Sequence, residues 1–294
     1  GLAAGACSGN GILLDISDPV KPVRLDAAAD KNFAYWHSAT FNDAGTKVVF
    51  TDEWGGGIGA RCRAEDPSTW GANMVATIEN RTLRGRAFHK LPSAQGADEN
   101  CVAHNGMIIP VPGRDLMVQA WYQGGVSVMD FTDPTKPVEI AAFDRGPIED
   151  GRLFVAGSWS AYWLNGRIYS SEIARGLDVL KLVPGEHLSA AEIAAAEAVR
   201  SDQINPQTQT RISWADSPDV AQSYLDQLMR APAADAVLTA QVQAGIDQWR
   251  RSARNRSGAA EIAAALSAAA EKETGTIAKG RLTALAGLFT RRAG

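Results

Sequence analysis

Two of the four histidines stand at matching places in the chain, and they are the first candidates for chemistry. His37 and His104 each lie in a short stretch that opens a group of strand-like segments. Glu53 and Glu172 stand at matching places in the second segment of their own groups. Two imidazoles and a carboxylate suit zinc, iron or copper and leave coordination positions open. These four residues are therefore candidate ligands of a transition metal.

A purely structural role for the same residues stays open. Each histidine could bond to backbone groups at a strand end, and the glutamates could pair with arginines such as Arg175. The third opening has Leu164 in place of histidine, which favours this alternative. The sequence has no Ser-His-Asp order, phosphate-binding loop or GxGxxG after a strand. No motif therefore supports a hydrolase active site or a nucleotide-binding site. Whether the protein is an enzyme is left open.

Aromatic residues gather near the same openings. Large rings at a channel mouth could stack on a sugar, a quinone or another aromatic ligand, or contact a protein partner. Alternatively, the rings fill wedge-shaped gaps between twisted sheets. The candidates for ligand or partner contact are Trp36, Trp54, Trp121, Tyr122 and Trp163, together with Arg175; Tyr35, Trp159 and Tyr162 lie in the same stretches.

The elements that position these residues are short strands in repeated groups. Residues 15–23 (DISDPVKPV) match residues 130–138 (DFTDPTKPV), and each copy predicts a strand, an Asp-Pro turn and the start of the next strand. Groups open near residues 34, 101 and 161, and each continues with a second strand that ends in glycine and then a third. Repeated groups of antiparallel strands favour a β-propeller over the main alternative, a β-sandwich.

The repeated unit resembles that of the LVIVD-repeat propeller proteins of bacterial and archaeal envelopes. It spans residues 12–23 and 126–138, and residues 177–179 form a partial third copy, so the resemblance covers about 180 residues. More distantly, the histidine-bearing openings are similar to those of selenium-binding-protein and methanethiol-oxidase propellers, whose channel histidines hold copper. The resemblance implies a propeller fold and an extracytoplasmic location.

The number of strand groups predicts an incomplete ring. The sequence contains the end of one blade, two full blades and a fourth that begins at residue 156, whereas closed propellers have about four to eight. We expect a protein partner or an upstream propeller segment to complete the ring. Alternatively, the C-terminal helices cover one open face with a stripe of Val237, Ile246 and Trp249.

The composition changes after Pro184, where Ala, Glu, Gln and Arg become frequent. We expect propeller blades in residues 1–184 and an α-helical region in residues 185–294. A capping box at Ser189 and Pro218 in a first turn mark two of the helix starts. A final helix over residues 282–289 is apolar and flanked by arginine, which indicates contact with a partner helix or peripheral association with a membrane complex.

Charge and cysteine content narrow the functional classes. The net charge of −4 provides no basic field for nucleic acid, and no apolar run approaches the roughly 18 residues of a membrane span. Cys62 and Cys101 are expected to form a disulfide in an oxidising compartment, and Cys7 should lack a partner in this chain.

The sequence therefore predicts a mainly β protein with an incomplete propeller and a C-terminal helical region. We expect an extracytoplasmic module that binds a protein or a ligand within a larger assembly. The alternative is a copper-, iron- or zinc-dependent oxidoreductase with a His-lined central channel. In that case His37 and His104 lie near the channel axis, with Glu53 and Glu172 at the same mouth or one strand further out.

Overall fold

The computed structural model describes residues 1–149, 152–231 and 234–294, which divide into two compact units. The β unit comprises Gly1–Ile109, Asp115–Leu182 and Ser201–Arg211. The helical unit comprises Pro110–Arg114, Val183–Arg200 and Ile212–Gly294. Both units are thus discontinuous in sequence, whereas the change in composition indicates a single boundary after Pro184.

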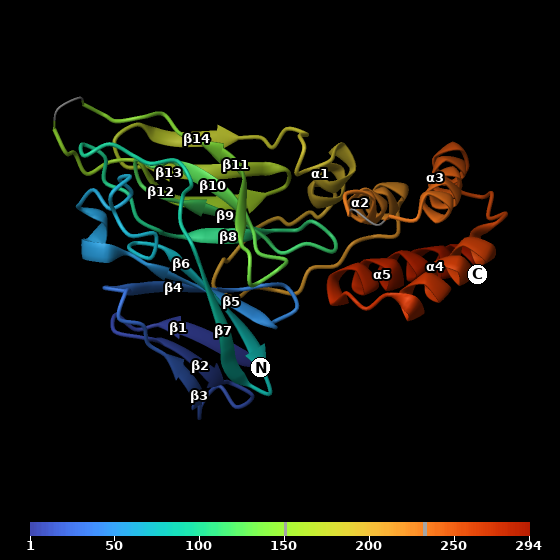
Figure 1. Cartoon of the computed structure of the whole chain (residues 1–294), viewed down its shortest axis with the longest axis horizontal. Helices are drawn as coiled ribbons and strands as arrows, with labels where there is room; N and C mark the ends of the chain where they lie inside the picture. The colour runs from blue at the N-terminus through green and yellow to red at the C-terminus, as the bar shows by residue number, and fades with distance from the viewer. Residues whose placement is uncertain (150–151, 232–233) are drawn as a thin grey trace. The chain divides into compact units, whose positions relative to one another are not determined.

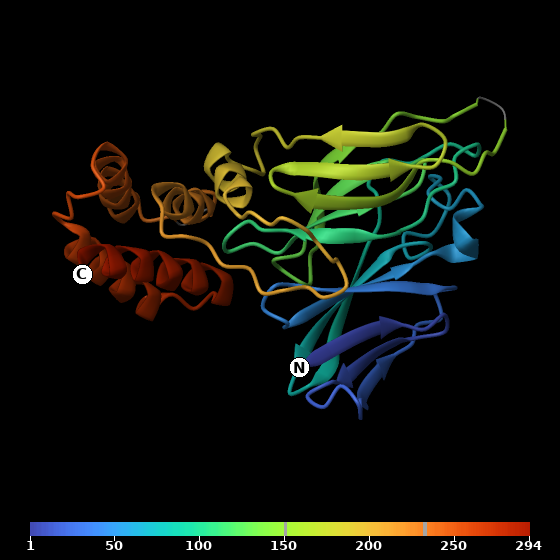
Figure 2. The same ribbon diagram turned by 180° about the vertical axis from the view of Figure 1, so that it is seen from behind.

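In the part of the β unit that the structure describes there are four antiparallel sheets, each a meander of strands in chain order (Figures 1 and 2). The first sheet comprises β1 (Leu2–Ala6), β2 (Gly11–Asp15) and β3 (Val23–Ala28), and the second comprises β4 (Trp36–Phe41), β5 (Lys47–Asp52), β6 (Asn73–Glu79) and β7 (Thr82–His89). The third comprises β8 (Gly106–Ile109), β9 (Leu116–Ala120), β10 (Val126–Asp130) and β11 (Val138–Phe143), and the fourth comprises β12 (Ser158–Leu164), β13 (Arg167–Glu172) and β14 (Gly176–Leu180).

The repeated Asp-Pro segment forms the same hairpin in two sheets, as predicted. It joins β2 to β3 and β10 to β11, and both hairpins carry a register shift in the middle of the pairing. The Asp18 carboxylate accepts the N–H of Val20 at 3.0 Å, and the Asp133 carboxylate accepts that of Thr135 at 2.9 Å. These side-chain bonds hold the turn, and proline ends the strand pairing because it has no N–H.

The first strands of successive sheets contact one another. β1 contacts β4, β4 contacts β8, and β8 contacts β12, and each of these strands lies at the edge of its own sheet. Such a succession is typical of the inner strands of propeller blades. The mainly β class and the C-terminal helices are confirmed, while the incomplete propeller stays a prediction.

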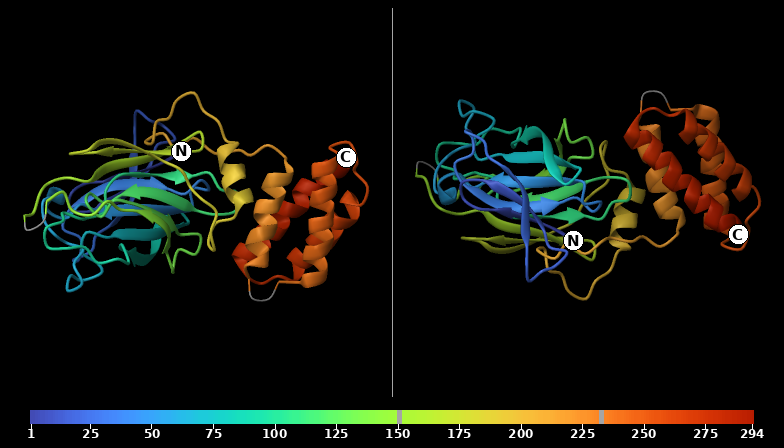
Figure 3. Two further views of the ribbon diagram at one scale, coloured as in Figure 1. Left: turned by 90° about the horizontal axis from the view of Figure 1, so that it is seen from above. Right: turned by 90° about the horizontal axis from the view of Figure 1, so that it is seen from below.

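The described residues of the helical unit form five helices with their own core. They are α1 (Ala190–Glu197), α2 (Pro218–Met229), α3 (Ala236–Arg251), α4 (Ala259–Lys272) and α5 (Thr276–Ala293). The capping box at Ser189 is formed, and Pro218 lies in the first turn of α2. Figure 3 shows α4 and α5 side by side.

Two expectations about the surface of these helices are wrong. Val237 is 79% exposed, whereas Ile246 and Trp249 lie in the core of the helical unit, so the three residues do not form one stripe. The last helix is longer than expected, and its apolar Leu285 and Phe289 are buried in the same core. Because these side chains pack against neighbouring helices, they are not free to meet a membrane. No helix among the described residues is both long and apolar enough to cross a bilayer.

The segment between β8 and β9 belongs to the helical unit. The Trp214 indole N–H donates to the Pro110 carbonyl at 2.8 Å, and the Arg114 guanidinium contacts the Glu192 carboxylate at 3.0 Å. Glu192 is fully buried, and its pairing with Arg114 and Arg230 compensates that burial.

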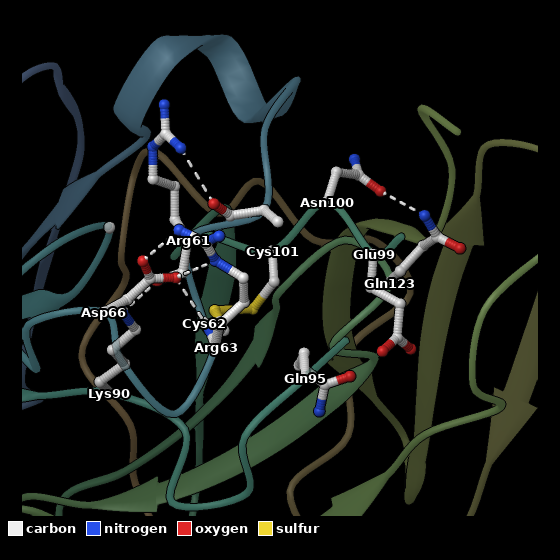
Figure 4. Close-up of a disulfide and its surroundings, with 12 residues drawn as sticks. Arg61, Cys62, Arg63, Asp66, Lys90, Gln95, Glu99, Asn100, Cys101 and Gln123 are labelled. Carbon is white, nitrogen blue, oxygen red and sulfur yellow. Dashed lines mark hydrogen bonds and ion pairs between the residues drawn. A yellow bond between two sulfur atoms is a disulfide. The ribbon is translucent and has the colours of Figure 1, made fainter. Parts of the chain in front are cut away.

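The predicted disulfide between Cys62 and Cys101 is confirmed, with Cα atoms 5.7 Å apart (Figure 4). Cys7 is free and exposed, as expected. The bridge joins the loop after β5 to the segment before β8. Next to it, the Cys101 N–H donates to the Gly59 carbonyl at 3.5 Å, and the Asn100 amide donates to the Gly57 carbonyl at 2.8 Å.

We predict that the double variant Cys62→Ser with Cys101→Ser unfolds at lower denaturant concentration. A closed loop of 39 residues corresponds to about 3–4 kcal/mol of free energy of unfolding, mainly through the entropy of the unfolded chain. Urea unfolding of the oxidised protein measures this difference, and Cys7→Ser is the matched control. An unchanged midpoint in the double variant would contradict the prediction.

Candidate metal centre

The structure brings His37, Glu53 and His104 together in the β unit. The His37 Nε2 lies 3.3 Å from the Glu53 Oε2, and the His104 Nε2 lies 3.2 Å from the Glu53 Oε1. One donor atom from each residue lies within 4.8 Å of the others. The two imidazole rings stack with centroids 4.5 Å apart. Three of the four residues proposed from the sequence thus form one cluster.

Local strand geometry explains how His37 and Glu53 meet. Trp36 pairs with Asp52, and the register between β4 and β5 then shifts before Ala39. His37 lies within this shift, which changes the direction of a side chain relative to a regular strand. Glu53 directly follows β5, and its N–H donates to the Tyr35 carbonyl at 2.9 Å. The bulge and the strand end therefore bring both side chains to one place.

His104 lies two residues before β8 and is fully buried. Its Nδ1 hydrogen-bonds the backbone carbonyl of Trp159 in β12. Because a carbonyl can only accept a hydrogen bond, Nδ1 must carry the proton. In the neutral ring, Nε2 then has a lone pair that can accept a hydrogen bond or bind a metal. That Nε2 instead faces the Glu53 carboxylate. A proton or a metal cation between these two atoms would remove the repulsion.

Tyr122 completes the surroundings of Glu53. It follows β9 with a φ of 53°, and its hydroxyl donates to the Glu53 Oε1. Gly57, at the end of the short 3₁₀ helix η1 (Trp54–Gly57), packs against the Tyr122 ring so closely that a Cβ there would lie 2.2 Å from a ring atom. Positive φ values outside glycine are uncommon and often mark functional sites.

The surroundings shift the pKa values of His37, Glu53 and Tyr122. Burial lowers the pKa of His37 below its usual value; Glu53 opposes this effect, and His104 adds to it. Burial alone would raise the pKa of Glu53, but its contacts with His104 and Tyr122 and the charge of His37 bring that pKa below its usual value. Burial and then Glu53 raise the pKa of Tyr122, so the phenol keeps its proton. Glu53 is therefore an anion, and His37 is readily a neutral ligand.

The spacing of the donor atoms fits a metal ion. Metal–ligand bonds of about 2.0–2.2 Å place neighbouring donors about 3.0–3.5 Å apart in tetrahedral or octahedral geometry. The separations of 3.3 Å from His37 to Glu53 Oε2 and of 3.2 Å from His104 to Glu53 Oε1 fall in this range. The three donor atoms together lie within 4.8 Å of one another, so a bound ion would draw them somewhat closer. The bond from His104 Nδ1 to a backbone carbonyl is also the usual outer-shell support of a metal-binding histidine. Three protein ligands leave one or more positions open.

Glu172 does not belong to the cluster. One of its carboxylate oxygens accepts the N–H of Gly157 at 2.6 Å, and the other accepts that of Ala174 at 2.9 Å and that of Arg175. It therefore holds the turn after β13. The Arg175 guanidinium donates to the carbonyls of Gly146 and Pro147 rather than to Glu172.

Most of the aromatic candidates are core residues. Trp36, Trp121 and Trp163 are at most 3% exposed, so these three rings fill the interior and are not available to a ligand or partner. Trp54 packs on Trp70 with ring centroids 4.5 Å apart.

The sequence places Trp159 among the aromatic residues at the openings but does not connect it with the metal candidates. Its carbonyl binds His104, its ring lies 4.8 Å from the His104 ring, and its side chain is 47% exposed. In the sequence, its place at the opening of the fourth strand group was the only signal that pointed to this contact. The Tyr122 backbone also pairs with that of Ser158, so β12 is held against this part of the third sheet.

No family model matches the chain, and no curated protein matches it. The resemblance to LVIVD-repeat propellers therefore stays a prediction.

We predict that Gly57→Ala destabilises the β unit more than Gly55→Ala. Both glycines have φ near +70°, so each substitution brings a backbone cost of about 1–2 kcal/mol. Only position 57 adds a clash with Tyr122, worth about 1–3 kcal/mol more, because no described atom lies within 4 Å of a Cβ at position 55. Urea unfolding of the two variants measures the difference. Equal losses would show that Gly57 does not hold Tyr122 in place.

Proposed function

We propose that the β unit binds a divalent transition metal ion through His37, Glu53 and His104 and acts as a metal-dependent oxidoreductase. The observation that carries the proposal is the His104 Nε2, which is buried, has no hydrogen-bond partner among the described residues and faces the Glu53 carboxylate. A metal cation coordinated by both atoms satisfies them at once. The open positions of such a site would receive a substrate or a small oxidant.

The surrounding groups favour redox chemistry over hydrolysis. Metal-dependent hydrolysis commonly uses a second carboxylate as general base. Here Glu53 is itself a ligand, and Tyr122 keeps its proton. The neighbouring Asp52 accepts the N–H groups of Ala34, Tyr35 and Gly71, so its carboxylate is engaged with backbone.

When bound, iron or copper would supply one-electron chemistry that no side chain here provides. Glu53 and the two histidines would hold the ion, and Tyr122 would orient Glu53 through its hydroxyl. The Trp159 carbonyl would fix the His104 ring.

The location and the architecture are part of the same proposal. The Cys62–Cys101 disulfide is compatible with an oxidising, extracytoplasmic compartment. The four sheets in chain order, with their first strands in succession, support a propeller whose inner strands carry the site.

A binding module without a metal is the second candidate. Tyr35 and Trp159, which are 42% and 47% exposed, lie beside the cluster and favour contact with a ligand or a protein partner. In this case the two histidines and Glu53 form a hydrogen-bonded and charge-paired network, with a proton shared between His104 and Glu53.

Metal content separates the two candidates. We predict one equivalent of copper or iron in the purified protein, and uptake of one Co²⁺ or Zn²⁺ as a probe of the same ligands by the metal-stripped protein in calorimetric titration. His104→Ala and His37→Ala should each weaken binding at least ~100-fold, because each removes one of three ligands. His187→Ala, an exposed histidine in the helical unit, is the matched control. Protein that takes up no metal, or variants that bind it as well as the wild type, would leave the binding module as the function.

A further inference from the structure

An open pocket of about 610 Å³ lies where the first strands of all four sheets come together. β1 contributes residues 4–6 to its wall, β4 contributes residues 37–40, and Tyr162 comes from β12. Asn105 and Gly106 line it at the start of β8. Its volume lies in the usual range of small-molecule sites.

His37 belongs both to this pocket and to the metal cluster. Its side chain is 25% exposed, whereas that of Glu53 is 8% exposed and that of His104 is fully buried. The pocket is therefore the route by which a molecule could approach the cluster from the side of His37.

Residues Ser201–Arg211 form a segment, here called the strap, that runs across the β unit (gold in Figure 2). At one end, Ser201 and the Asn165 side chain exchange two hydrogen bonds of 2.8 and 2.9 Å. At the other end, the Gln209 side chain exchanges two with the Phe41 backbone, of 2.8 and 2.9 Å. The strap is thus fixed to the fourth and the second sheet, and its residues 205–207 line the pocket.

The pocket wall is polar but carries no permanent charge. Its hydrogen-bonding side chains are Ser38, Thr40, Asn105, Tyr162, Asn205 and Gln207. Among the described residues that line it there is no Asp, Glu, Lys or Arg. A charged ligand would lose hydration here without gaining a counter-charge, whereas hydroxyl groups can pair with amides and hydroxyls.

We propose that this pocket binds a neutral, hydroxyl-rich molecule of mono- to disaccharide size, with the strap as the wall that sets its specificity. The proposal rests on the proposed function in so far as this molecule is the substrate of the metal site. Asn105 and Gln207 carry the main hydrogen bonds, because their side-chain amides form no hydrogen bond with other described residues. Tyr162 offers a ring and a hydroxyl.

The test is titration of the metal-stripped full chain with neutral sugars and their charged analogues, followed by ligand-observed NMR. The probes are glucose, galactose and maltose against gluconate and glucosamine. We expect at least one neutral sugar to bind, and gluconate and glucosamine to bind at least ~10-fold more weakly than glucose. Equal binding of the charged analogues, or no binding of any neutral sugar, would overturn the proposal.

Variants of the strap locate the binding. Gln207→Ala should weaken binding of the best neutral sugar about three- to tenfold, as expected for one lost hydrogen bond. Gln203→Ala is the matched control, because Gln203 lies on the same strap outside the pocket lining. Equal affinities of the two variants would overturn the assignment of the pocket.

Metal and sugar binding are measured separately, so the two proposals fail separately. Uptake of metal without sugar binding overturns the pocket ligand and leaves the metal site. Sugar binding without uptake of metal supports the pocket ligand and overturns the oxidoreductase.

Discussion

The Glu53 carboxylate is the group on which the arrangement of the β unit depends. A carboxylate that is largely removed from water is costly unless charges and hydrogen bonds compensate it. Tyr122 donates to one oxygen of Glu53, and His37 faces the other. His104 Nε2 lies against the same oxygen as Tyr122, so this contact compensates the carboxylate once a proton or a metal cation lies between them. These partners come from two sheets, so the pairing of Glu53 also holds the sheets together.

Backbone and covalent links bring the partners of Glu53 within reach. The loop after Glu53 and the segment before His104 are joined by the Cys62–Cys101 disulfide. Between the same segments, the Ala103 N–H donates to the Gly71 carbonyl at 2.8 Å. Because the segment that the disulfide holds continues directly into His104, oxidation of the two cysteines should order one ligand of the proposed metal. Folding of the β unit and formation of the proposed site should therefore occur together.

The sequence predicted the parts of this account that follow from repetition. Matching openings placed His37 and His104 at the starts of their strand groups, and the matching second segments indicated Glu53. The Asp-Pro hairpins and the disulfide also followed from local pattern and compartment. The same logic failed for Glu172, because a short glycine-rich turn offers its carboxylate three backbone N–H groups, and those local bonds hold it.

Other features depend on packing that no repeat reveals. Trp36, Trp121 and Trp163 stand beside the openings in sequence, yet side-chain direction sends them into the core. The contribution of Trp159 is a backbone carbonyl, which has no signature in residue type. The helical stripe failed because α2, α4 and α5 provide a core that already covers Ile246 and Trp249. Tertiary contacts thus decide which apolar side chains are buried, and the amphipathic pattern of one helix alone does not.

The central claim is that one metal ion lies between two imidazoles and a carboxylate. X-ray absorption spectroscopy of the metal-loaded protein tests it most directly, because imidazole rings give a distinctive outer-shell scattering. The account predicts nitrogen and oxygen ligands at about 2.0–2.2 Å with scattering from two imidazoles, reduced to one in His104→Ala. A bound metal without imidazole scattering, or a spectrum unchanged in that variant, would contradict it.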